Sequence, residues 1–150
     1  MKPRTLGNLL VTIQFAALAT LIFLAAQKVL QQPAPAWAWL ACWLSVTLGL
    51  WALLANRPGN FNIHPTPRAD GMLIAHGPYR WIRHPMYTAV MLLGLACVLT
   101  RGDVLAWLLW GLLCLVLLAK AVLEERWMMA LQPSYAHYRS RTRWFIPYLL

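Results

Sequence analysis

The chain has 150 residues, of which 61% are hydrophobic and only 11% are charged. Soluble proteins carry roughly 25% charged residues, so this deficit excludes an ordinary soluble globular domain. The formal net charge is +9, but no basic stripe or known motif indicates nucleic-acid binding. Cations that flank apolar runs are better explained by the positive-inside rule and by anionic lipid head groups.

Four apolar runs predict an all-α integral membrane protein with one domain over residues 1–150. Its bundle is expected to have four or five helices, with membrane spans at residues 9–30, 36–54, 86–99 and 104–123. At about 1.5 Å per residue, the first run can cross a hydrocarbon layer of roughly 30 Å. It exceeds the apolar core of a signal peptide, and no small-x-small cleavage pattern follows, so we expect a retained helix.

Two polar segments follow the second and fourth runs. Residues 56–83 contain four prolines and three glycines, which argues against a regular helix and predicts a long functional loop. Pro85 fits the first turn of a helix, with His84 at or next to the cap. Arg101, Gly102 and Asp103 predict a tight turn, and a short amphipathic helix is expected at residues 134–143.

The distribution of cations predicts the orientation. With four spans, the termini and the long loop share one side, which carries eleven of the 13 Lys and Arg residues, Lys120 included, while Lys28 and Arg101 fall on the other. The positive-inside rule then predicts a multi-pass protein with cytoplasmic termini, in the inner membrane if the source is bacterial. The loop of residues 56–85 and the C-terminal segment are therefore expected to form one cytoplasmic pocket.

Several residues near the start of the third span could bind an anion. A helix N-terminus presents free N–H groups and partial positive charge, and Arg80, Arg83 and His84 lie beside it. Alternatively, the two arginines are ordinary juxtamembrane anchors. Neighbouring tyrosines either anchor the membrane interface or line a pocket for a cation or an adenine ring; they are Tyr79, Tyr87, Tyr135 and Tyr138.

Half of the acidic residues stand together at the end of the fourth span, as Glu124 and Glu125. Adjacent helical residues point about 100° apart, so we expect only one of them to face inward. Carboxylates at a helix C-terminus oppose the helix dipole, which favours pairing with a protein arginine or a ligand cation over a solvated helix end. No His, Cys or acidic cluster has metal-ligand spacing, so no metal site is predicted.

Two segments resemble the isoprenylcysteine carboxyl methyltransferase family in its short prokaryotic form. The first contains Pro67-Arg68, Gly77-Pro78-Tyr79-Arg80 and Arg83-His84-Pro85-Met86-Tyr87, and the second contains Lys120, Glu124-Glu125, Tyr135, Tyr138, Arg141 and Phe145-Ile146-Pro147. Related membrane phospholipid methyltransferases share this pattern, so the pattern identifies a superfamily better than a substrate.

The resemblance implies methyl transfer from S-adenosylmethionine. It implies a cofactor pocket with the residues Gly77, Pro78, Tyr79, Arg83, His84, Pro85, Tyr87, Glu124 and Glu125. Glu125 and Arg141 are then the catalytic candidates, since Arg141 resembles an arginine near the carboxylate of the methyl acceptor. The charges agree, because the cofactor carboxylate suits Arg83 with His84, and its ammonium suits a glutamate.

The implied acceptor is lipophilic, for example a carboxylate on a prenylcysteine-like group, and membrane lipids are the expected surroundings. An ionised carboxylate needs no general base. The chain departs from the family at Lys120, where an arginine is usual, and at Met128 and Arg143-Trp144. Two alternatives remain: an NADPH-dependent membrane reductase of the sterol-reductase type, which NADPH binding would reveal, and a non-catalytic membrane scaffold.

Overall fold

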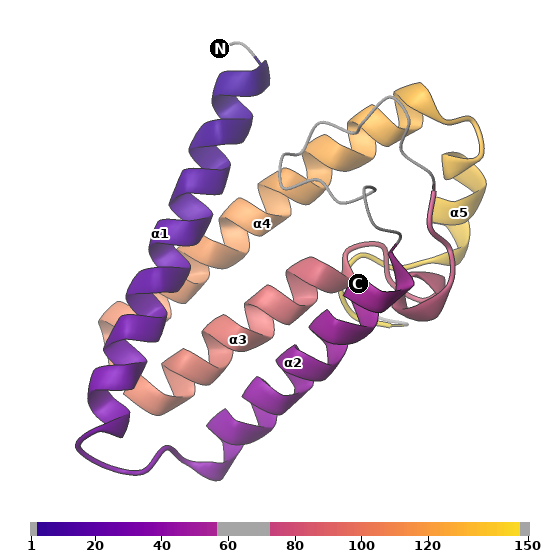
Figure 1. Ribbon diagram of the computed structural model, residues 1–150. Coiled ribbons are helices and arrows are strands. Elements are labelled where there is room, and N and C mark those ends of the chain that lie inside the picture. The colour runs from indigo at the N-terminus through magenta and orange to yellow at the C-terminus, as the bar shows by residue number, and fades with distance from the viewer. Residues whose placement is uncertain (1–2, 57–72, 148–150) are drawn as a thin grey trace.

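A computed structural model describes residues 3–56 and 73–147, with side chains from Thr5 onward in the first helix. Figure 1 shows the long helices of the bundle and the short C-terminal helix beside it. The described elements are α1 (Pro3–Val29), α2 (Ala36–Ala55), the 3-10 helix η1 (Gly77–Arg80), α3 (Pro85–Arg101), α4 (Val104–Leu131) and α5 (Tyr135–Arg141). Residues 57–72 of the expected loop, with Pro67 and Arg68, lie outside the described residues.

The predicted all-α membrane fold is confirmed. Three helices, α1, α2 and α4, are long and apolar enough to cross a membrane, and α3 is a shorter apolar helix. Many large apolar side chains point outward, among them Trp37 at 70% and Leu54 at 85% exposure. Such side chains are costly in water but suit a helix surface that faces lipid.

The turns around α3 form as the sequence predicts. His84 is the N-cap residue of α3 and Pro85 is its first residue. Gly102 ends the helix with a φ of 78°, a left-handed conformation that suits glycine. Asp103 then caps α4, because its side chain accepts a hydrogen bond of 2.9 Å from the Ala106 N–H.

The end of α4 differs from the expected boundary at residue 123, because the helix continues to Leu131. Residues 124–131 are mostly good helix formers, and the first breaker is Pro133. The 28 residues of α4 span about 42 Å, against a hydrocarbon layer of roughly 30 Å. The helix is therefore long enough to cross the layer and to carry Glu124, Glu125 and Arg126 beyond it.

Small residues allow the helices to approach closely. Such packing is typical of membrane bundles, because the hydrophobic effect does not drive helices together in lipid, whereas close contacts and interhelical hydrogen bonds do. Between α2 and α3, the Ser45 hydroxyl donates to the Ala89 carbonyl at 2.7 Å. Between α3 and α4, Trp110 Nε1 donates to the Met91 carbonyl at 2.9 Å, beside Gly94. Helix α1 packs on α3 and α4 around a core that includes Ala17, Leu21, Cys97, Val98, Leu113 and Leu117.

Candidate functional site

The segment before α3 pairs with the segment after α5, although the two are about 60 residues apart. The Arg83 N–H donates to the Arg143 carbonyl at 2.7 Å, and the His84 N–H donates to the Trp144 carbonyl at 3.1 Å. In return, the Arg143 N–H donates to the Trp81 carbonyl at 2.9 Å. These backbone bonds bring together the two regions that the sequence analysis placed in one pocket.

Glu125 is the buried centre of the site, with a side chain that is 5% exposed. Its Oε1 accepts from Arg83 Nε at 2.5 Å and lies 3.4 Å from His84 Nε2. Its Oε2 lies 3.3 Å from Arg139 Nε. Both oxygens are thus engaged by protein cations, and Arg83 is fixed further by a hydrogen bond of 2.5 Å to the Thr142 carbonyl.

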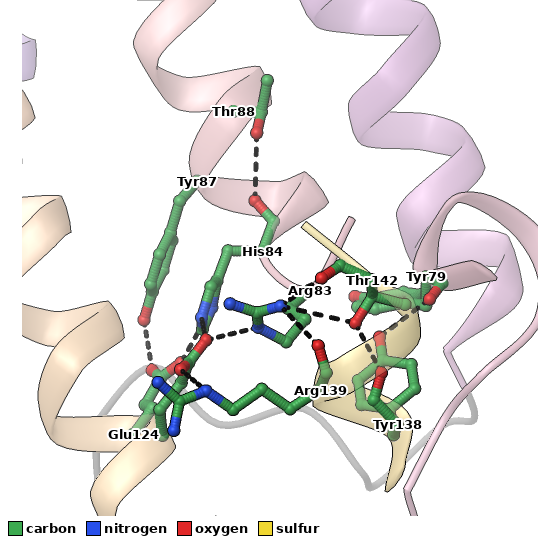
Figure 2. Close-up of polar contacts among 10 residues, drawn as sticks. Tyr79, Arg83, His84, Tyr87, Thr88, Glu124, Tyr138, Arg139 and Thr142 are labelled. Atoms are coloured by element: carbon green, nitrogen blue, oxygen red, sulfur yellow. Dashed lines mark hydrogen bonds and ion pairs between the residues drawn. The ribbon is translucent and has the colours of Figure 1, made fainter. Parts of the chain in front are cut away.

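Glu124 has a different environment, since its side chain is 23% exposed. It accepts a hydrogen bond from the Tyr87 hydroxyl, and its Oε2 lies 3.5 Å from His84 Nδ1. Figure 2 shows these contacts between the start of α3 and the C-terminal third of α4. The expectation that only one glutamate faces inward is wrong, because both flexible side chains reach His84 from adjacent positions.

His84 lies between the two carboxylates and is only 8% exposed. Its ring stacks on Tyr87, with ring centroids 5.4 Å apart and planes 3° apart. Burial disfavours the charged imidazolium, but the hydrogen bonds and negative charges of Glu124 and Glu125 outweigh it, so the pKa of His84 is raised. His84 therefore keeps its positive charge to a higher pH than a free histidine does.

The remaining tyrosines border the same site. Burial, together with the Glu124 charge, raises the pKa of Tyr79 to about 12, so its phenol stays protonated at neutral pH. Burial also raises the pKa values of Tyr135 and Tyr138. The Tyr138 hydroxyl donates to the Tyr79 carbonyl at 2.8 Å, which ties α5 to η1.

The Gly77-Pro78-Tyr79 turn forms η1 and packs on α2. Gly77 has a φ of 60°, and an added Cβ would lie 2.7 Å from the Ala55 Cβ. Only glycine suits both the conformation and the close approach. Pro78 is buried beside it, so this turn supports the site through its backbone.

Two of the arginines singled out in the sequence lie apart from the carboxylates. Arg80 is exposed, with its guanidinium 5.9 Å from the centre of the Trp81 ring. Arg141 is exposed at the end of α5 and makes no hydrogen bond or ion pair to another described side chain. The structure therefore brings together Arg83, His84, Tyr87, Glu124 and Glu125, but not Arg141.

Sequence reasoning missed Arg139 and Thr142. Arg139 is one of three arginines spaced two residues apart in or after α5, and that spacing does not indicate which one turns toward α4. Thr142 contributes mainly its backbone carbonyl, which accepts a hydrogen bond from Arg83. Every residue has a backbone carbonyl, so the residue type at position 142 could not indicate this role. The alternation of arginines at residues 139–143 could indicate that α5 supplies a cation to the site, but it could not identify which arginine.

Residues 36–132 match the family described as phospholipid methyltransferase. The matched span runs from α2 to the end of α4 and covers more than half of the 150 residues. It contains both glutamates and the Arg83-to-Tyr87 motif, and it omits α1 and α5. No curated protein and no solved structure matches the chain.

Proposed function

We propose, because this chain belongs to the phospholipid methyltransferase family, that it is a membrane methyltransferase that uses S-adenosylmethionine and acts on a lipophilic acceptor. Family membership supports membrane methyl transfer in general terms. The observation that carries the finer proposal is the difference between the two glutamates. Glu125 is enclosed by three protein cations, whereas Glu124 is partly exposed and bonded by a neutral phenol and by His84.

The charges of the site fit the methyl donor. S-adenosylmethionine has an ammonium, a carboxylate and an electrophilic methyl group on a sulfonium. Glu124 is the carboxylate best able to receive the ammonium, because part of its side chain is exposed. The half-exposed Arg139 guanidinium suits the carboxylate. Arg83 is buried against Glu125, so its role is to hold that carboxylate rather than to contact the donor.

The contacts of His84 bear on the acceptor. Its two ring nitrogens face carboxylates, with Nδ1 3.5 Å from Glu124 Oε2 and Nε2 3.4 Å from Glu125 Oε1, so the ring is poorly placed to take a proton from an acceptor. An amine acceptor must lose a proton, whereas an ionised carboxylate is ready to attack. The site therefore favours an acceptor with an ionised carboxylate, such as a prenylcysteine-like group. The residues contribute by aligning donor and acceptor, and the resemblance to isoprenylcysteine carboxyl methyltransferases supports the same acceptor.

Calorimetry of S-adenosylmethionine binding to the protein in detergent tests the proposal. We expect binding by the unaltered protein and a loss of about tenfold or more in Glu124→Gln, which removes a charge-assisted contact. Asp103→Asn is the matched control, because it changes a carboxylate at the opposite end of α4 and asparagine also caps helices. Binding of NADPH without binding of S-adenosylmethionine would refute the proposal and favour the reductase alternative.

The acceptor is tested with methyl-labelled S-adenosylmethionine and two lipids in the same detergent. We expect label in a prenylcysteine carboxylate and little in an aminophospholipid. Label only in the aminophospholipid would leave the methyltransferase assignment intact and overturn the carboxylate acceptor. The ester product is distinguishable from a methylamine because mild base releases its label as methanol.

A further inference from the structure

A second polar contact lies deeper in the bundle, between α1 and α4. The Lys120 side chain is 1% exposed, and its Nζ donates to Gln14 Oε1 at 2.7 Å. Gln14, on α1, is itself 6% exposed. The cation count placed Lys120 with the charges on one membrane surface, but the structure buries it inside the bundle.

Stability alone does not explain why Lys120 and Gln14 are buried as a pair. A charged side chain within a membrane span costs several kcal/mol unless it is paired. Apolar residues of similar volume at the same positions are often as stable or more stable. Lys120 lies among apolar residues of α4, next to the buried Leu117 and Ala121. The contacts of its ammonium group therefore indicate a role beyond packing.

Those contacts lead to the site. Lys120 Nζ lies 5.1 Å from the centre of the Tyr87 ring, within the range of a cation–π interaction. The Tyr87 hydroxyl donates to Glu124. On α4, Lys120 precedes Glu124 by four residues, so the two side chains share one helix face. A continuous series of contacts thus runs from Gln14 through Lys120 and Tyr87 to Glu124.

We propose that Gln14 and Lys120 are positioning residues for the methyl donor, an inference that rests on the proposed function. Gln14 holds the Lys120 ammonium, the ammonium holds the Tyr87 ring, and the Tyr87 hydroxyl sets the orientation of the Glu124 carboxylate. The family match begins at residue 36, so it does not include the helix that supplies Gln14. Helix α1 is accordingly part of the functional unit.

The double variant Gln14→Leu/Lys120→Met tests this role, because it replaces both polar partners by apolar residues of similar size. We expect its melting temperature in detergent to be unchanged or higher, since no buried polar group loses its partner. Its affinity for S-adenosylmethionine should fall about fivefold to tenfold, the effect of one misaligned hydrogen bond to a charged group. Lys120→Arg should stay within about twofold of the unaltered affinity, because arginine also makes cation–π contacts.

Leu117→Met is the control, because it changes a fully buried residue on the same helix without touching the polar contacts. A double-mutant cycle adds a second measurement. Tyr87→Phe removes the hydroxyl that reaches Glu124, so adding Gln14→Leu/Lys120→Met to it should weaken binding by less than about twofold. This cycle requires only that the variants fold well enough for the affinity of the folded fraction to be measured.

Unchanged affinity in the double variant would overturn the inference, and so would an effect that adds fully to that of Tyr87→Phe. A lower melting temperature with unchanged affinity of the folded fraction would also overturn it, by assigning the pair to packing. If the unaltered protein does not bind S-adenosylmethionine, the proposed function fails first. The two failures are therefore distinguishable in one set of titrations.

Discussion

Arg83 Nε and Glu125 Oε1 meet at 2.5 Å, and both side chains are almost completely buried. The residues are 42 positions apart, so their ion pair joins the segment before α3 to the C-terminal third of α4. Arg83 also donates to the Thr142 carbonyl, which adds the segment after α5. One side chain thereby connects three parts of the chain around the candidate site.

Replacing Arg83 by glutamine should lower the free energy of unfolding in mixed micelles by about 3 kcal/mol, the usual cost of breaking a buried ion pair. The remaining neighbours of Glu125 are His84 and the half-exposed Arg139, which compensate its charge only in part. Arg80→Gln is the control, because Arg80 is exposed, and it should change stability by less than about 0.5 kcal/mol. Equal effects of the two substitutions would contradict the central position of Arg83.

The raised pKa of His84 predicts a pH dependence of stability. The charged ring contributes its full stabilisation below the pKa in the unfolded chain, about 6.5. That contribution is lost as pH rises through the higher pKa of the folded protein. Unfolding measured at a series of pH values should therefore show declining stability above about pH 6.5, and His84→Gln should lack this component. A difference between the two proteins that grows with pH would contradict the assignment.

Gly94 should be intolerant of even one added carbon. A Cβ there would lie 2.9 Å from Trp110 Cδ1 and 3.0 Å from Leu113 Cδ2, so α3 and α4 would have to separate. We expect Gly94→Ala to destabilise the bundle by about 1–3 kcal/mol, as overpacking does. Gly111→Ala is the matched control, because nothing lies within 4 Å of its added Cβ. That variant should be neutral or stabilised in the same unfolding assay.

Thr88 ties the C-terminal segment to α3, because its hydroxyl donates to the Phe145 carbonyl at 3.0 Å. Thr88→Val keeps the shape and should cost about 1 kcal/mol. We expect faster proteolysis of the residues after α5, followed by mass spectrometry. Thr100→Val is the control, since the Thr100 hydroxyl donates within its own helix, to the Ala96 carbonyl. Equal cleavage of both variants would show that Thr88 does not retain the segment.

The sequence was sufficient to predict that four long helices exist and where the turns around α3 fall, because apolar runs, Pro85, Gly102 and Asp103 act locally. It did not give every helix end, since α1 begins at Pro3 and not at residue 9. It also predicted that His84 and the glutamate pair share a site, since the number of spans decides which ends meet. The predicted end of the fourth helix, residue 123, was wrong because Glu124, Glu125 and Arg126 were taken as a boundary. These residue types favour a helix as much as the apolar residues before them do.

The contact network itself could not be predicted. Whether Arg139 or Arg141 turns toward Glu125 depends on how α5 is rotated against α4, and the arginines are equivalent as a pattern. The burial of Lys120 depends on Gln14, a residue 106 positions away in the mostly apolar middle of α1. Such pairings are tertiary, so no local propensity or spacing encodes them.

The backbone pairing of residues 81–84 with residues 143–144 has a consequence for biosynthesis. A ribosome makes the chain from the N-terminus, so α1 to α4 can enter the bilayer before residues 142–145 have emerged. Until then Arg83 and His84 lack the carbonyl partners that Thr142, Arg143 and Trp144 supply. A translation intermediate stalled after α4 would thus be inserted in the membrane and would still lack these contacts, so the candidate site would form only after the segment that follows α5 has emerged.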